Sequence, residues 1–239
     1  MGWHEGALLG FDLETTGIDP CSDLPVQVAL VLAEPGRLLS SDVFIVDPGR
    51  EIPPGAEAIH GISTERARRE GRSLAEAAHT LRSALQDAED RGVPVVAMNA
   101  SFDLTIAAAL FDAFSHAPAS WSMVVDPLVI DRKVDQYRSG KRRLDALCVT
   151  YGIELHNAHD AGGDAEATIE LARVIGKRFP EIGALDAREL TVLEVQWHRE
   201  WATSYDAWRR ESGKPGLSPE EFAWPLRRKA GAPPTTIAS

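Results

Sequence analysis

The most constraining feature of the sequence is an apolar run at residues 7–13 that contains Asp12 and is followed closely by Glu14. The almost continuous apolar pattern predicts a β-strand that is covered on both faces. Because Asp12 and Glu14 are two residues apart, their side chains share one face of such a strand. Burying two like charges side by side is costly unless cations neutralise them. The pair therefore predicts either a cation site or a strand end that turns into solvent with both acids exposed.

Two further acids occupy positions from which they could join this pair. Asp103 follows a second predicted buried strand, residues 93–98, and Asp164 follows two glycines near a predicted helix start. Each acid alone is explained as a first-turn residue that the helix dipole favours. In open α/β sheets, however, ligands collect at the carboxyl ends of strands. If the fold gathers all four acids, they form an oxygen-rich pocket suited to two hard divalent cations.

Composition sets broad limits on the chain. Its 239 residues suffice for one well-buried domain with an extension. The net charge of −11 argues against binding along a nucleic-acid duplex, but not against gripping a few terminal nucleotides where bound metals supply positive charge. No apolar run could span a bilayer, no signal peptide is apparent, and Cys21 and Cys148 are too few for a disulfide scaffold. We therefore expect a cytoplasmic location and no membrane partner.

Because the chain is acidic overall, any basic strip on its surface is expected to be confined to one short region. The densest run of cations is formed by Arg132, Lys133, Arg138, Lys141, Arg142 and Arg143. A solvated helix or loop face explains this run as well as a nucleic-acid contact does.

Turn residues and apolar periodicity divide the chain into alternating elements. Strands are predicted at residues 7–13, 26–33, 41–46, 93–98 and 122–127. Helices are predicted at residues 74–90, 102–114, 144–151 and 165–179, the first with Ser73 and Glu76 as a capping box. Residues 47–55 read as an irregular, proline-stiffened stretch. Three meander strands followed by alternating helices and strands predict a mixed α/β sheet with helices on both faces.

We divide the chain into a domain at residues 1–181, a helical extension at 182–230 and a disordered tail at 231–239. Trp197, Trp201 and Trp208 share one face of the predicted extension helix, and Trp224 follows it. We interpret this face as packed onto the domain. The alternative is a contact with a polymerase or with a second copy of the chain, since tryptophan is enriched at interfaces.

Three segments, in this order, resemble the motifs of the DnaQ-like 3′–5′ exonucleases. FDLETTG at residues 11–17 resembles the first motif, and NASFD at residues 99–103 resembles the second. His159, four intervening residues and then DAEAT from Asp164 are similar to the third motif of the histidine-containing (DEDDh) branch. PPG at residues 53–55 followed by IHGI at 59–62 also matches a segment common in that family. The resemblance covers about the first 180 residues.

Two departures from the family pattern bear on the site. Met98 stands where many relatives carry a histidine, at a position outside the metal shell. His156 and Asp160 compete for the third motif, but only His159 has the family spacing and only Asp164 begins the family-like run.

The resemblance implies a ribonuclease H-like fold with a mixed five-stranded sheet and a two-metal site. Asp12, Glu14 and Asp164 would hold one Mg²⁺ or Mn²⁺, and Asp12 would also bind a second, with Asp103 helping directly or through water. His159 would take a proton from the attacking water. The candidates for contacting the terminal nucleotide are Thr15, Thr16 and His60, and a structural hydrogen bond is the alternative role for the histidine.

These features predict a metal-dependent 3′–5′ exonuclease that releases nucleoside monophosphates from nucleic-acid 3′ ends. Single-stranded or frayed DNA is the expected substrate, and an RNA-trimming or oligoribonuclease activity is the alternative. A phosphatase with Asp12 as nucleophile is a different class of enzyme with a superficially similar opening motif, but here Glu14 is one methylene too long and the later acid pair is missing. A non-catalytic module that binds a partner through its tryptophans is the third reading.

Overall fold

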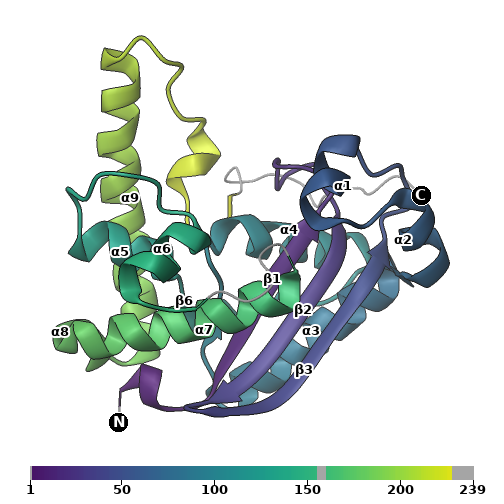
Figure 1. Ribbon diagram of the computed structural model, residues 1–239, viewed down its shortest axis with the longest axis horizontal. Helices are drawn as coiled ribbons and strands as arrows, with labels where there is room; N and C mark the ends of the chain where they lie inside the picture. Colours follow the sequence, from purple (N-terminus) through teal and green to yellow (C-terminus); the bar gives the residue numbers. More distant parts are fainter. Residues whose placement is uncertain (1, 155–159, 228–239) are drawn as a thin grey trace.

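Strands form one mixed sheet in the order β4-β3-β2-β1-β5-β6 in the computed structural model, which describes residues 2–154 and 160–227 (Figure 1). The strands are β1 (Leu8–Thr15), β2 (Pro25–Glu34), β3 (Arg37–Asp47), β4 (Arg72–Ser73), β5 (Val95–Val96) and β6 (Val124–Val125). The first three form an antiparallel meander, while β4, β5 and β6 each pair in parallel with a neighbour. The mixed α/β architecture agrees with the prediction.

The sheet has six strands in the described residues, one more than predicted. The extra strand, β4, is only two residues long and pairs with Val46 and Asp47 at the edge of the sheet. A strand this short leaves no alternating pattern in the sequence. β5 and β6 are likewise shorter than the strands predicted at residues 93–98 and 122–127.

β1 lies at the centre of the sheet, between β2 and β5. Leu8 and Phe11 are fully buried, as expected for a strand covered on both faces. Asp12 pairs with Ala29 and Glu14 with Gln27, and the register shifts between Glu14 and Thr15. Both acids therefore lie at the carboxyl end of a central strand, where the regular pairing with β2 ends.

Helices cover both faces of the sheet. They are α1 (Pro54–His60), α2 (Thr64–Glu70), α3 (Leu74–Asp90), α4 (Ser101–Ala113), α5 (Pro127–Val134), α6 (Leu144–Tyr151), α7 (Ala161–Arg178), α8 (Pro180–Gly183) and α9 (Ala187–Glu211), with 3₁₀ turns η1 (Trp3–Glu5) and η2 (Pro219–Phe222). α7 crosses the face that is in front in Figure 1, while α3 and α4 lie behind the sheet. None of the helices in the described ranges is long and apolar enough to cross a lipid bilayer.

Several helix boundaries follow directly from local sequence. α3 has the predicted limits, and Ser73 and Glu76 form the predicted capping box. The prediction of an irregular stretch at residues 47–55 was wrong at its end, because α1 begins at Pro54. Proline suits the first turn of a helix, since its φ is already helical and its missing N–H needs no partner there. α2 and α5 were not predicted.

The C-terminal helix α9 packs against the domain through its first half. Trp197 is buried, and Trp224, beyond the helix, is buried as well. Further along α9, Trp201, Tyr205 and Trp208 stack with ring centroids 5.1 and 5.6 Å apart. Arg132 covers the outer face of this stack at one end, and Lys214 covers it at the other. Trp208 is 49% exposed, so the tryptophan face is only partly covered by the domain. The predicted tail at 231–239 lies outside the described residues.

Candidate active site

Three of the predicted acids meet where β1 and α7 come together. Asp12, Glu14 and Asp164 each offer a carboxylate oxygen, and these oxygens lie within 4.8 Å of one another. All three side chains are only partly buried, so a ligand can reach them. A cluster of carboxylate oxygens in this arrangement is the donor set that hard divalent cations prefer.

Close contact between β1 and α7 brings these acids together. A Cβ atom placed on Gly10 would lie 2.8 Å from both the Ala165 carbonyl oxygen and Ile169 Cδ1, so only glycine allows this approach. Asp160 is the N-cap of α7, and its Oδ2 accepts the N–H of Gly163 at 3.3 Å. The capping role separates Asp160 from Asp164, which lies in the first turn of the helix.

Asp103 approaches the same end of β1 from the opposite side, on the first turn of α4. Its side chain is 4% exposed, and its Oδ1 accepts the backbone N–H of Leu13 at 3.1 Å. Asp103 is not in the group of three carboxylates. Of the neighbouring charges, however, the charge of Asp103 raises the pKa of Asp12 most. The structure therefore brings all four predicted acids to one end of β1 and places Asp103 on the Leu13 backbone.

The electrostatics of the cluster favour a bound cation. Burial raises the pKa of Asp12 well above its ordinary value, and the charges of Asp103 and Asp164 raise it further. Burial likewise raises the pKa of Glu14 to about 7, with the charges of Asp164 and Asp160 adding to the effect. Without a counter-charge, the site therefore holds protons near neutral pH. Divalent cations would replace those protons, so the residues present fit such ions.

The predicted nucleotide-contacting residues lie in and beside the turn that follows β1. The Thr15 hydroxyl donates to the Gly17 carbonyl oxygen at 2.7 Å, and the Thr16 hydroxyl donates to Asp23 at 2.7 Å. The same Thr16 oxygen accepts from Arg50 at 2.6 Å. These bonds shape the turn, so both hydroxyls have structural partners. A nucleotide contact through these threonines stays a prediction.

His60 ends α1 beside the Thr15 backbone. Its Nδ1 accepts the N–H of Ile62 at 3.1 Å, so the structural role weighed for this histidine is present. Burial lowers the pKa of His60, and the nearby Thr15 carbonyl opposes that change. A neutral imidazole that faces the turn after β1 is therefore expected near pH 7. His159, the predicted proton acceptor, lies outside the described residues.

One buried acid that the sequence analysis missed, Asp126, shapes the second motif. Asn99 has a left-handed backbone with φ of 59°. The N–H groups of Asn99 and Ala100 donate to the two carboxylate oxygens of Asp126 at 3.0 and 2.8 Å. Ala100, the N-cap of α4, makes no side-chain capping bond, so Asp126 satisfies amides at the start of the helix that carries Asp103. Its position near the end of the strand predicted at residues 122–127, directly before Pro127, was the available signal.

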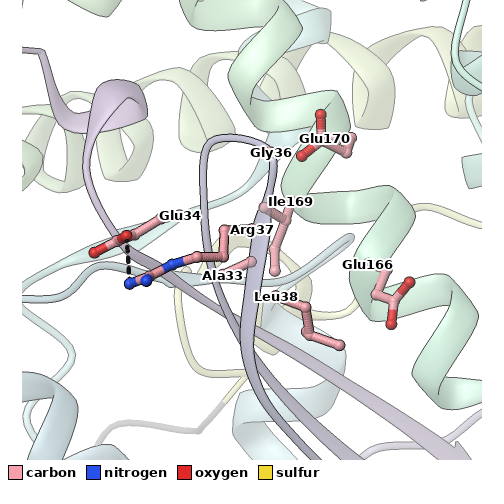
Figure 2. Close-up of a pocket in the computed structure, with 8 residues that line it drawn as sticks. All are labelled: Ala33, Glu34, Gly36, Arg37, Leu38, Glu166, Ile169 and Glu170. Carbon is pink, nitrogen blue, oxygen red and sulfur yellow. Dashed lines mark hydrogen bonds and ion pairs between the residues drawn. The ribbon is translucent and has the colours of Figure 1, made fainter.

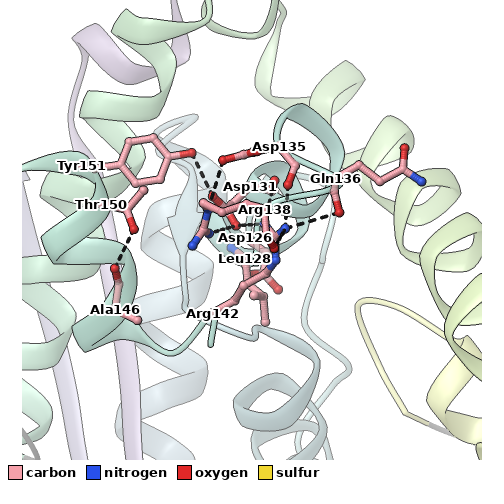
Figure 3. Close-up of polar contacts among 10 residues, drawn as sticks. All are labelled: Asp126, Leu128, Asp131, Asp135, Gln136, Arg138, Arg142, Ala146, Thr150 and Tyr151. Carbon is pink, nitrogen blue, oxygen red and sulfur yellow. Dashed lines mark hydrogen bonds and ion pairs between the residues drawn. The ribbon is translucent and has the colours of Figure 1, made fainter. Parts of the chain in front are cut away.

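Three arginines of the basic run make structural contacts within the protein. Figure 3 shows Arg138 and Arg142 directed at Asp131, which is fully buried and pairs with both guanidinium groups. The Tyr151 hydroxyl donates to the other oxygen of this carboxylate at 2.9 Å. Arg132 lies over Trp201 with its guanidinium carbon 3.5 Å from the ring centroid. Arg132 thus joins α5 to α9, while Asp131 of α5 holds the α5–α6 loop through Arg138 and Arg142 and holds α6 through Tyr151.

A cavity of about 190 Å³ lies at the opposite end of β2 from the acids (Figure 2). Glu34 and Arg37 line it at the β2–β3 turn, together with Glu166 and Glu170 of α7. Ala33, also in its lining, pairs with Leu8 at the start of β1, whereas Glu14 pairs with Gln27. The cavity is therefore separate from the acid cluster.

Known proteins with similar sequences include a nuclease and polymerase proteins. A DNA polymerase III subunit epsilon-like protein from Rhodobacter capsulatus is 33% identical over 77% of this chain and 25% of its own length. Exodeoxyribonuclease I from Escherichia coli is 28% identical over 76% of this chain and 42% of its own length. A PolC-type DNA polymerase III from Streptococcus agalactiae is 27% identical over 76% of this chain and 12% of its own length. The chain thus spans less than half the length of each relative.

Solved structures of exonuclease I have the same fold. A structure described as suggesting how processivity is achieved matches with a TM-score of 0.63 and 28% identity, over 74% of this chain and 42% of that one. E. coli exonuclease I in complex with a dT13 oligonucleotide matches with a TM-score of 0.62 and 28% identity over the same shares. The exonuclease family model, RNase_T, matches residues 9–172 and so includes the four converging acids. The chain therefore belongs to this exonuclease family, within the DnaQ-like, ribonuclease H-like group.

Proposed function

We propose that the protein is a metal-dependent 3′–5′ exonuclease that removes nucleoside monophosphates from the 3′ end of DNA. The observation that carries the proposal is the convergence of carboxylate oxygens from Asp12, Glu14 and Asp164 within 4.8 Å. Family membership supports nuclease chemistry over an Asp12-nucleophile phosphatase.

The site residues then divide the work of phosphodiester hydrolysis. When bound, two Mg²⁺ or Mn²⁺ ions supply positive charge to the attacking and leaving oxygens of an in-line displacement. Asp12, Glu14 and Asp164 would hold these ions, with Asp103 contributing from the α4 side. His159 would accept the proton of the attacking water, a task for a group that titrates near neutral pH. Thr15, Thr16 and His60 would border the terminal nucleotide.

DNA is proposed as the substrate for two reasons. The similar proteins include a DNA polymerase III subunit epsilon-like protein and an exodeoxyribonuclease, and E. coli exonuclease I has been solved in complex with a dT13 oligonucleotide. A frayed or single-stranded end suits the net charge of −11, since a long duplex would be repelled outside the metal site. RNA trimming by the same site is the alternative. The PolC-type relatives support a polymerase as a candidate partner, and the exposed Trp208 end of α9 is the proposed contact.

Product analysis tests the proposal directly. The purified chain is incubated with 3′-blocked and 5′-blocked DNA and RNA oligomers, with Mg²⁺, with Mn²⁺ or with EDTA, and the products are identified by mass. We expect nucleoside monophosphates from 5′-blocked DNA only when a divalent cation is present. Monophosphates mainly from RNA would favour the trimming alternative. Release of inorganic phosphate would instead favour a phosphatase.

Isosteric variants separate the site from the fold. Asp12→Asn and Asp164→Asn remove charge from the cluster and are expected to abolish nucleotide release while circular dichroism stays unchanged. Asp87→Asn is a matched control, because this acid lies on an exposed part of α3. Full activity in both cluster variants would refute the proposed site. A folded wild-type chain that binds DNA but releases nothing would support the non-catalytic reading.

A further inference from the structure

Residues beyond the matched exonuclease region reach the turn that precedes Asp103. After α9, the chain returns to the start of α4 (Figure 1). There the N–H of Arg227 donates to Thr105 Oγ1 at 2.8 Å, and its guanidinium donates to Ser101 Oγ at 3.0 Å and to Asn99 Oδ1 at 3.3 Å. One side chain from the C-terminal segment thus spans residues 99–101, which we call the 99–101 turn.

Asp126, which also supports this turn, is itself held by two residues of the C-terminal extension, one in α9 and one beyond it. The backbone N–H of Asp126 donates to the Glu194 carboxylate of α9 at 3.0 and 3.3 Å. The Trp224 indole N–H donates to Asp126 Oδ2 at 3.3 Å. Glu194 is fully buried and Asp126 is 1% exposed. Two buried acids and an indole therefore form one hydrogen-bonded group behind the turn.

Burying the acids Glu194 and Asp126 together is costly, and the contacts that they make indicate a role in positioning. Burial raises the pKa of Glu194 well above its ordinary value, and the charge of Asp126 adds to this. An apolar side chain in place of Glu194 would avoid that desolvation. The polar group instead orients the backbone N–H of Asp126, whose side chain fixes Asn99 and Ala100.

The 99–101 turn leads directly to the acid cluster. Asp103 follows Ser101 by two residues on the same helix, and its carboxylate accepts the N–H of Leu13, between Asp12 and Glu14. A shift of the turn would therefore move the Asp103 carboxylate relative to Asp12. Misplacement of a reacting group by about 1 Å can cost about 100-fold in rate.

We propose that Arg227, Trp224 and Glu194 are positioning residues of the nuclease site, which hold the 99–101 turn and thereby keep Asp103 against β1. This inference rests on the proposed exonuclease function. It assigns the C-terminal extension a role in the reaction, in addition to any contact that α9 makes with a partner. All three residues lie beyond residue 172, where the family match ends.

Steady-state kinetics of the full chain test the role of Arg227. In Arg227→Gln, we expect kcat for release of the 3′ nucleotide to fall by about 10- to 100-fold, as for other residues that orient a metal-site ligand, with KM unchanged. Arg199→Gln removes an exposed arginine of α9 and is the matched control, expected to keep wild-type kinetics. A raised KM with unchanged kcat would assign Arg227 to nucleic-acid binding and overturn the proposal. Wild-type kinetics in Arg227→Gln would overturn it as well.

A pair of variants at Glu194 separates positioning from general stability. Glu194→Gln keeps an oxygen that can accept the Asp126 N–H, whereas Glu194→Leu keeps the bulk and removes the acceptor. We expect the glutamine variant to retain more of kcat than the leucine variant at a temperature where both are folded. Equal kcat values in the two variants would contradict the proposed role.

Hydrogen exchange gives a readout that does not depend on catalysis. The amides of Asn99 and Ala100 are expected to exchange about fivefold faster in Trp224→Phe and Arg227→Gln than in the wild type. Unchanged exchange in both variants would refute the positioning role. A wild-type chain that is inactive on every oligomer would refute the proposed function instead, while the exchange rates would still decide whether these residues hold the turn.

Discussion

Removal of the Glu14 charge should stabilise the metal-free protein while it abolishes activity. Glu14 lies beside Asp12 and Asp164, and its pKa is raised to about 7, mainly by burial. Below pH 4.5 the carboxyl is protonated in both folded and unfolded chains, so its burial carries little electrostatic cost. As the pH rises to about 7, the unfolded chain ionises first and the folded state loses stability relative to it. Glu14→Gln cannot ionise and escapes this loss.

The size of the effect follows from the pKa change. A rise from 4.5 to about 7 corresponds to at most about 3 kcal/mol of lost stability above pH 7. Because Glu14 is only half-buried, solvent screening reduces this to about 1–2 kcal/mol. The substitution also removes one of the charges that raise the pKa of Asp12, which adds in the same direction.

Urea unfolding in EDTA at pH 5 and pH 8 measures this effect. The measured quantity is the free energy of unfolding of Glu14→Gln minus that of the wild type. This difference should be about 1–2 kcal/mol larger at pH 8 than at pH 5. Glu166→Gln, at an exposed position of α7, is the control and should show no such pH dependence. Mn²⁺ should stabilise the wild type and have less effect on Glu14→Gln. An advantage at pH 8 no larger than that at pH 5 would refute the assigned electrostatics.

Three further perturbations test separate parts of the structure. Gly10→Ala should lower the free energy of unfolding in urea by about 1–3 kcal/mol and should also lower kcat, because the added methyl group pushes α7 away from β1. Unchanged values would contradict the close contact between these two elements. Asp131→Ala should lower the free energy of unfolding, measured by thermal unfolding, by about 3–5 kcal/mol, because Arg138 and Arg142 lose their buried partner. A loss below about 1 kcal/mol would show that solvent replaces the Asp131 carboxylate as their partner. His159→Gln should lower kcat by about 10²- to 10⁴-fold, with Mn²⁺ affinity kept in calorimetry; unchanged kcat would exclude the proton-transfer role.

Much of the sheet and the whole acid cluster could be predicted from local sequence signals. β1 was predictable because its buried apolar run contains Asp12 and is followed by Glu14, two acids whose burial side by side is explained by a nearby cation. α3 was predictable because Ser73 and Glu76 form a capping box, which acts within four residues of chain. In both cases, the physical cause lies inside the element itself.

The contacts that support Asp103 could not be predicted in the same way. Arg227 reaches Ser101 across 126 positions of the chain, and Glu194 reaches Asp126 across 68. Within the basic run, the pairing of Arg142 with the buried Asp131, 11 residues away, could not be predicted either. Pairings of this kind depend on tertiary packing, which leaves no periodic pattern in the sequence.

The supports of the site indicate that it is preorganised before cations bind. Like charges gathered at one point tend to push apart the elements that carry them, yet each element here is held by contacts that do not use the side chain of a cation ligand. β1 is paired on both sides. α7 is anchored by the buried Arg173, which donates to the carbonyl oxygens of Gly6 at 3.0 Å and Ala33 at 2.9 Å. The start of α4 is held by Asp126 and Arg227. EDTA should therefore leave the fold intact, and cation affinity should depend on these distant anchors as well as on the carboxylates.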